Sequence, residues 1–199
     1  MHINLATKTV SFKIVYFGPG CCGKTTNILK LSELLGKEKP VVLANSDERT
    51  IFFDFTYLDK GKVEDFNVRL NIYTIPGQSL YKVSRKLILN GVDGIVFIAD
   101  SSRKKLKENI ESFNELKRYL SEMGISLKEI PIVIQYNKRD LPDAMPVSEL
   151  EKKLNAIKAP YVESVAIEGK GVVETIDAIT DLVIKRYKEH IKNTKVEKD

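Results

Sequence analysis

Residues 18–25 form a glycine-rich segment, GPGCCGKT, whose spacing is G-x-x-x-x-G-K-[ST]. Glycines let a backbone wrap closely around phosphate groups and aim several N–H groups at them. In such a loop Lys24 reaches the outer phosphates, Thr25 offers a hydroxyl to Mg²⁺, and a helix starting there directs its positive dipole end at the anion. The segment predicts a site for a nucleoside triphosphate with Mg²⁺. A plain turn between a strand and a helix is the alternative.

A second polar segment, NKRD at residues 137–140, directly follows the apolar run 130–136. The carboxylate of Asp140 can accept hydrogen bonds from N1–H and the 2-amino group of guanine, which adenine does not offer. A site built on such bonds rejects the wrong base. We expect Asn137 to contact N7 and O6 and the stem of Lys138 to lie along the sugar. After a phosphate loop, this segment predicts guanine specificity, and a polar turn after a strand is the alternative.

A third segment, TIPGQ at residues 74–78, also follows a strand-like run. The N–H of Gly77 can detect a γ-phosphate there, and Gln78 can orient the attacking water. Many regulatory GTPases carry an aspartate where this chain has Thr74, and that aspartate holds Mg²⁺ through water. How the metal is held without this charge stays open. A turn glycine beside a chance glutamine is the alternative.

Arg49 and Thr50 precede the first strand of a predicted hairpin. Thr50 is placed to coordinate Mg²⁺ only when a γ-phosphate is present. Arg49 can swing toward the phosphates as an arginine finger supplied by the chain itself, which is worth ~10³–10⁵ in rate. A solvated turn arginine is the alternative. We therefore expect Lys24, Arg49 and Gln78 to be catalytic, and Thr25 and Thr50 to hold the metal.

The elements that position these residues alternate between strand-like and helix-like patterns, which predicts a doubly wound, mostly parallel α/β sheet. The predicted strands are 3–6 and 10–17 (a hairpin that adds an extra N-terminal edge strand), 51–58 and 66–75 (a second hairpin around residues 60–62), 94–99, 130–136 and 161–165. The predicted helices are 27–35, one with apolar positions from Leu106 to Leu120, 147–154 and 172–190.

The composition limits the kind of protein. The chain of 199 residues is too short for two ordinary domains, so we expect one small-GTPase (G) domain over 1–192 and a charged, frayed tail over 193–199. No run approaches the ~20 apolar residues that span a bilayer, and no signal peptide or lipidation motif is visible. The net charge of +5 comes from dispersed lysines rather than a basic patch. We expect a cytoplasmic protein with no membrane anchor of its own and no nucleic-acid partner.

Five segments resemble the MglA family, the bacterial Ras-like small GTPases of gliding motility and cell polarity. They are residues 12–26, 47–55, 73–78, 84–99 and 131–142, and the resemblance extends from about residue 4 to residue 183. The pieces DERT at 47–50 and TIPGQ at 74–78 are more diagnostic than the phosphate loop. A threonine at the position of Thr74 is usual in that family. The resemblance implies a Ras-like P-loop fold with a six-stranded sheet and helices on both faces.

The resemblance also assigns roles to single residues. It implies that Arg49 is an intrinsic arginine finger, Gln78 the catalytic glutamine and Thr50 the switch threonine. It places Ala166, in the loop with Val165, against guanine O6. The residues that we expect to contact nucleotide are Gly18, Pro19, Gly20, Cys21, Cys22, Gly23, Lys24, Thr25, Thr26, Thr50, Gly77, Asn137, Lys138, Asp140, Val165 and Ala166.

The resemblance further implies a Roadblock-fold, MglB-like GTPase-activating protein that orders these residues without donating an arginine, besides unknown effectors. We predict a GTP/GDP switch, monomeric on its own, that hydrolyses GTP slowly without this partner and is recruited by partners to the cell poles. A non-hydrolysing GTP-binding scaffold is the alternative, which Thr74 leaves open, whereas Gln78 and Arg49 favour the enzyme. A kinase or ATPase on the same loop is disfavoured by Asp140. Cys21 and Cys22 fit a crowded loop as small side chains, and a redox role stays open.

Overall fold

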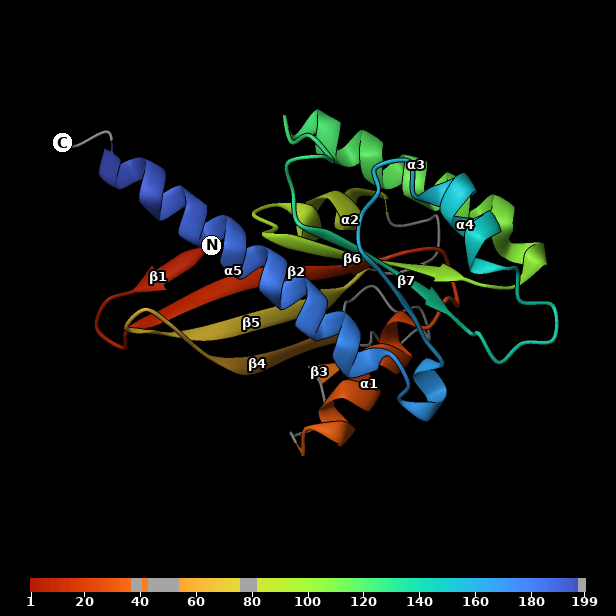
Figure 1. Ribbon diagram of the computed structural model, residues 1–199, viewed down its shortest axis with the longest axis horizontal. Coiled ribbons are helices and arrows are strands. Elements are labelled where there is room, and N and C mark those ends of the chain that lie inside the picture. The colour runs from red at the N-terminus through yellow and green to blue at the C-terminus, as the bar shows by residue number, and fades with distance from the viewer. Residues whose placement is uncertain (37–40, 43–53, 76–81, 197–199) are drawn as a thin grey trace.

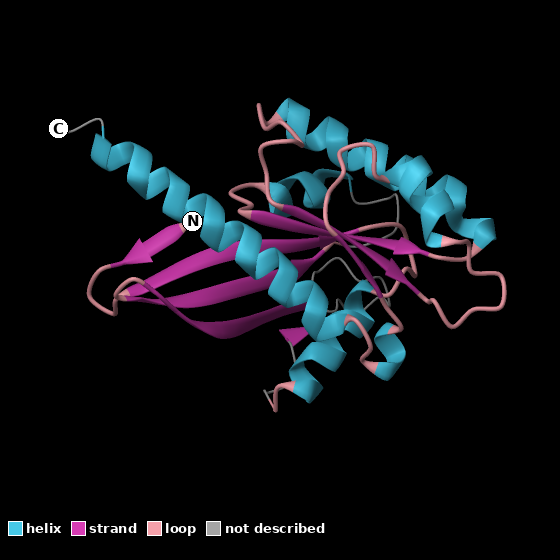
Figure 2. Ribbon diagram, viewed as in Figure 1, coloured by secondary structure: helices cyan, strands magenta, loops and turns pink. Residues whose placement is uncertain are grey.

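The computed structural model describes residues 1–36, 41–42, 54–75 and 82–196. In these ranges, eight strands form one sheet that carries helices on both faces (Figures 1 and 2). The strands are β1 (His2–Asn4), β2 (Thr9–Phe17), β3 (Val41–Val42), β4 (Asp54–Val63), β5 (Phe66–Thr74), β6 (Gly94–Asp100), β7 (Ile132–Asn137) and β8 (Tyr161–Glu163). The helices are α1 (Lys24–Leu34), α2 (Lys82–Leu89), α3 (Leu106–Glu122), α4 (Val147–Leu154) and α5 (Val172–Val196), with 3-10 turns η2 (Arg103–Lys105) and η3 (Ala166–Glu168).

The sheet order is β3-β4-β5-β2-β6-β7-β8, with β1 paired to β2. Strands β5, β2, β6, β7 and β8 run parallel, whereas β4 is antiparallel to β5 and β3 to β4. The predicted doubly wound sheet is confirmed. In a parallel sheet of this kind, ligands bind outside the carboxyl ends of the strands. The loops that follow β2, β6, β7 and β8 therefore form one candidate surface.

The extra N-terminal strand, β1, is also present and pairs antiparallel with the start of β2, His2 opposite Ser11 and Asn4 opposite Thr9. On β2, pairing with β6 begins only at Ile14. Because β1 and β6 use successive stretches of β2, β1 lies beside the part of β2 that β6 does not reach. The outermost strands of the sheet are β3 and β8.

Two apolar layers flank the sheet, and the alternation of side chains along β2 separates them. Phe12, Ile14 and Tyr16 face the layer formed with α1 and α5. Val15 and Phe17 face the layer formed with α2, α3 and α4. All residues of β6 and β7 are buried, as is typical of central parallel strands. The rigid core thus holds the carboxyl ends of β2, β6 and β7 in place.

The largest differences between the structure and the sequence prediction concern the second hairpin and the end of the last helix. Strand β4 continues to Val63, and the hairpin turns at Glu64 and Asp65 rather than at residues 60–62, where a register shift marks a bulge. Gly61, with φ of 72°, supplies the left-handed conformation that such a bulge uses. Helix α5 ends at Val196, six residues after the predicted end at 190. The single domain over 1–192 and the frayed tail over 193–199 stay predictions.

Helix α2 was not predicted from the sequence. Its eight residues end in three consecutive apolar side chains, and a short apolar run does not separate helix from strand. Among the described helices, none is long and apolar enough to cross a bilayer.

Candidate functional site

The phosphate-loop segment connects the end of β2 to the start of α1 and packs tightly against neighbouring strands. A Cβ on Gly18 would lie 2.3 Å from the backbone oxygen of Ile98, on β6. A Cβ on Gly23 would lie 2.3 Å from Nδ2 of Asn137, at the end of β7, and Gly23 has φ of 103°. Both glycines are therefore required by space, and the loop is fitted between the ends of β6 and β7.

The N-terminus of α1 faces this loop. Gly23 is its N-cap, and no side chain caps the helix. The first backbone N–H groups of a helix have no partner within it and carry the positive end of the helix dipole. Lys24, Thr25 and Thr26 supply these groups, so the helix start is suited to an anion such as a phosphate.

The ammonium group of Lys24 lies inside the loop rather than in solvent. Its Nζ donates hydrogen bonds to the backbone oxygens of Gly18, at 2.9 Å, and Pro19, at 2.6 Å. The Lys24 residue is only 7% exposed. Within the described part of the chain, this buried cation is held by neutral carbonyls and has no paired carboxylate, which favours the approach of an anion.

The two cysteines of the loop differ in environment. Cys21 is exposed and adopts a left-handed conformation with φ of 59°, whereas Cys22 is fully buried. Burial raises the pKa of the Cys22 thiol, opposed by the nearby Lys24. Because the thiolate is the reactive form, Cys22 acts as an apolar packing group. A redox role for Cys21 stays untested.

Asn137 ties three segments of the site together. Its Nδ2 donates to the backbone oxygen of Cys22 at 2.8 Å, and its Oδ1 accepts from the backbone N–H of Ala166 at 2.9 Å. Ser164 Oγ donates to the same oxygen at 3.3 Å. The amide keeps one N–H for a base nitrogen such as N7, whereas its oxygen cannot bond the O6 acceptor. Asn137 therefore joins the phosphate loop to the loop after β8.

The loop after β8 is closed by its own hydrogen bonds. The N–H of Val165 donates to the backbone oxygen of Lys170 at 3.1 Å, and Ala166, which begins η3, is 2% exposed. Because the Ala166 N–H is bonded to Asn137, it must leave that partner to contact guanine O6. This contact, expected from the sequence resemblance, stays a prediction.

Lys138 is held by a carboxylate that the sequence reasoning missed. Its Nζ lies 2.6 Å from Oδ2 of Asp100, which ends β6 and is 2% exposed. The other oxygen of Asp100 accepts the N–H of Ser102 at 3.0 Å. Its place at the end of a central apolar strand is a feature of the sequence that could have identified Asp100 as a site residue. The ion pair fixes the lysine stem across the site, which suits the expected position along a sugar.

Asp140 contrasts with its neighbours because its side chain is exposed and makes no hydrogen bond or ion pair within the described residues. Arg139 turns away, donating to Oε2 of Glu163 at 3.0 Å and to the backbone oxygen of Met145 at 2.7 Å. The paired Glu168 raises the pKa of Lys170, and Asp140 adds a smaller contribution. A carboxylate with free acceptor sites at the rim is what guanine recognition needs.

Four predicted residues, Arg49, Thr50, Gly77 and Gln78, lie outside the described residues. Thr74 is described: it is buried, ends β5 and lies opposite Tyr16 of β2 in the sheet. The chain therefore leaves β5 beside the strand that leads into the phosphate loop. The described residues contain no group of three or more His, Cys, Asp or Glu side chains able to hold a metal. The hydroxyl of Thr25 fits Mg²⁺ held mainly by nucleotide phosphates rather than by a protein cage.

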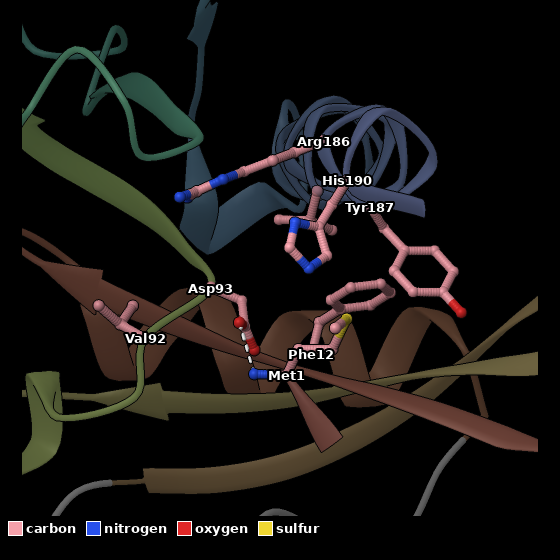
Figure 3. Close-up of a pocket in the computed structure, with 8 residues that line it drawn as sticks. Met1, Phe12, Val92, Asp93, Arg186, Tyr187 and His190 are labelled. Atoms are coloured by element: carbon pink, nitrogen blue, oxygen red, sulfur yellow. Dashed lines mark hydrogen bonds and ion pairs between the residues drawn. The ribbon is translucent and has the colours of Figure 1, made fainter. Parts of the chain in front are cut away.

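A separate cavity of about 220 Å³ lies at the opposite end of the sheet (Figure 3). Phe12 and Tyr187, whose rings meet edge to face with centroids 5.8 Å apart, line it together with Asp93, which precedes β6. Asp93 accepts the N–H of Lys13 at 2.8 Å. Because this cavity adjoins the start of β6, it is no part of the surface at the carboxyl ends of the strands.

A parallel sheet with this phosphate loop after β2 and an Asn-Lys-x-Asp segment after β7 defines a small GTPase that binds guanine nucleotides. The chain belongs to the ADP-ribosylation factor family (Arf), whose model matches residues 1–183. It is 45% identical over 190 residues to mutual gliding-motility protein MglA of Myxococcus xanthus. The alignment covers 94% of this chain and 97% of the relative.

More distant relatives agree with this class. ADP-ribosylation factor-like protein 4A of Homo sapiens is 28% identical over 188 residues, covering 89% of this chain and 86% of the relative. Ras-related protein Rab-27B of Rattus norvegicus is 23% identical over 190 residues, covering 92% and 84%. The predicted small GTPase that hydrolyses GTP to GDP, and its likeness to MglA, are confirmed.

Proposed function

We propose that this GTPase is a GTP/GDP switch that controls cell polarity or surface motility. The observation that carries the proposal is the 45% identity, over 94% of the chain, to a relative named mutual gliding-motility protein. The protein acts in the cytoplasm, as a monomer when alone, and partners recruit it to the cell poles. An MglB-like Roadblock-fold protein accelerates its hydrolysis, and effectors recognise its GTP state.

The described residues support the binding half of this mechanism. Lys24 and the N-terminus of α1 hold the β- and γ-phosphates, and Asp140 reads the guanine edge. Mg²⁺, when bound with the nucleotide, would neutralise charge on the phosphate oxygens. We assign it to the hydroxyls of Thr25 and Thr50, which requires no carboxylate at the position of Thr74.

The hydrolytic half rests on residues outside the described ranges. We propose that Gly77 senses the γ-phosphate, Gln78 orients the attacking water, and Arg49 stabilises the charge that develops on the phosphoryl oxygens. The activating partner holds these residues in place. Stabilising one loop arrangement by ~3 kcal/mol raises its population over a hundredfold, enough to turn a slow hydrolase into a timer.

Single-turnover hydrolysis tests this proposal. Purified chain loaded with GTP and Mg²⁺ is followed alone and with a Roadblock-fold protein from the same organism. We expect slow hydrolysis alone and at least about tenfold acceleration with the partner. The control is the chain loaded with a non-hydrolysable GTP analogue, which should bind the partner without turnover. An unchanged rate at saturating partner would contradict the assignment of the activator.

A further inference from the structure

A buried series of polar side chains runs beneath the phosphate loop and joins α1, β7 and α5. Nε2 of Gln135 donates to Oδ1 of Asn27 at 2.9 Å and to Oγ1 of Thr175 at 2.8 Å. Nδ2 of Asn27 donates to the backbone oxygen of Gly23 at 2.9 Å, and Oγ1 of Thr175 donates to that of Gly171 at 2.6 Å. The three side chains belong to residues that are at most 1% exposed.

This network does not favour the stability of the folded chain. It lies within an otherwise apolar layer that includes Ile28, Val133 and Ile176. Oε1 of Gln135 has no hydrogen-bond partner among the described residues, and a buried unpaired carbonyl is unfavourable. A well-packed apolar side chain at this position would avoid that cost. The stability of the core therefore does not explain why a glutamine occupies position 135.

The ends of the network are the two halves of the nucleotide site. Gly23, which Asn27 holds, immediately precedes Lys24 and packs against Asn137. Gly171 immediately precedes α5, directly after the loop 164–170, and Thr175 lies in the first turn of this helix. A Cβ on Gly171 would lie 2.2 Å from the backbone oxygen of Glu163. Gln135 itself lies two residues before Asn137 on the same face of β7.

We propose that Gln135 is a positioning residue for nucleotide binding. Through Asn27 it fixes the phosphate loop, and through Thr175 and Gly171 it fixes the base-side loop, residues 164–170. The two loops then keep a fixed position relative to each other, so that they bind the phosphates and the base of one nucleotide together. It acts through these residues and not on the ligand. The inference rests on the proposed guanine-nucleotide site.

The two ends of the site can be separated by comparing GDP with GMP. Lys24 and the start of α1 hold the β-phosphate, which GMP lacks, whereas both ligands present the same base. Displacing the phosphate loop relative to the base side should therefore weaken GDP much more than GMP. A glutamine needed only for folding would lower stability and weaken both ligands alike.

The main variant is Gln135→Met, which keeps the length of the side chain but cannot donate to Asn27 or Thr175. On nucleotide-free full-length chain with Mg²⁺, we expect the Kd for GDP to rise at least about tenfold and that for GMP less than about threefold. The matched control is Thr180→Val on α5, because among the described residues the buried Thr180 hydroxyl bonds only Ile176 O, at 2.5 Å within the same helix. It should change neither Kd by more than about twofold.

A second pair keeps the test decisive if Gln135→Met does not fold. Thr175→Val removes the hydroxyl and should weaken GDP selectively, whereas Thr175→Ser retains it and should bind like the wild type.

Equal weakening of GDP and GMP, or unchanged GDP binding in the variants, would overturn the positioning role. The wild type separates this outcome from failure of the proposed function. If the wild-type chain bound GDP no better than ADP, the guanine site itself would be wrong.

Discussion

At the scale of single residues, the site combines side chains that are bonded to other parts of the protein with one that has no partner among the described residues. Asn137 and Lys138 are engaged by Cys22, Ala166 and Asp100. Asp140 alone of the predicted base-reading side chains has no partner in the described part of the chain. The held residues give the site its shape, and the available carboxylate gives it a base preference.

Replacing Asp140 by Asn should therefore change which base is bound. Its carboxylate would become an amide that meets guanine's 2-amino donor with a donor of its own, whereas xanthine offers a 2-carbonyl acceptor. We expect GTP binding to weaken by about 10- to 100-fold, since a hydrogen bond to a charged group contributes ~1.5–3 kcal/mol. Competition between GTP and XTP measures this, with Asp181→Asn, an exposed carboxylate on α5, as the control. Retained preference for GTP over XTP would show that Asp140 does not read the base.

Replacing Arg49 by Ala tests the internal arginine finger. An arginine aimed at the charge of the transition state contributes ~10³–10⁵ in rate, so partner-stimulated hydrolysis should fall by that order while GTP affinity stays close to wild type. Arg49→Lys should rescue poorly, because lysine lacks the planar fork that contacts two phosphate oxygens. Single-turnover rates and nucleotide affinity are measured on the same preparations. A near-normal stimulated rate would leave the guanine-nucleotide switch without this mechanism.

At the scale of elements, α2 is fastened to α3 by a buried ion pair. Arg85 of α2 is 5% exposed and contacts Glu115 of α3, whose other oxygen accepts the hydroxyl of Tyr119 at 2.9 Å. In the chain, α2 begins four residues after Gln78. The pair thus anchors the element that directly follows the proposed catalytic glutamine.

Removing this anchor should cost much more than removing an exposed ion pair. Glu115→Ala removes a carboxylate that pairs with the buried Arg85 guanidinium, and we expect a loss of ~3 kcal/mol in the free energy of unfolding. The control, Glu122→Ala, breaks the exposed pairs with Lys86 and Arg118 and should cost less than ~1 kcal/mol. Chemical denaturation of GDP-bound protein measures both. Similar losses in the two variants would mean that burial of the Arg85 pair has no special energetic weight.

At the scale of the whole molecule, nucleotide contacts come from segments that are distant in the sequence. The loops after β2, β6, β7 and β8 meet at one edge of a single sheet, with α1 and α5 on one face and α2, α3 and α4 on the other (Figure 1). A ligand that bridges these loops binds only the folded chain. Binding and global stability are therefore linked.

We expect GDP to raise the stability of the entire chain in one transition. At a concentration of about 100 times its Kd, GDP should add ~2.7 kcal/mol and raise the unfolding temperature by roughly 5–10 °C. ADP at the same concentration should produce no comparable shift. Differential scanning calorimetry measures both effects. Two separate transitions would contradict the predicted single domain over 1–192.

The sequence by itself determined the class of the protein and most of its elements. The phosphate loop, the Asn-Lys-x-Asp segment and the alternation of strands and helices depend on local spacing, so they could be read without a structure. Only the tertiary structure decided what the side chains between the motifs contact. Gln135 meets Asn27 from 108 residues away, and Asn137 meets Cys22 from 115 residues away. Local patterns carry no information on such contacts, because they arise when the sheet brings strand ends together. The sequence named Asp140 as the base-reading carboxylate, but only the fold showed that Asn137 and Lys138 are held by other parts of the protein while Asp140 has no partner among the described residues.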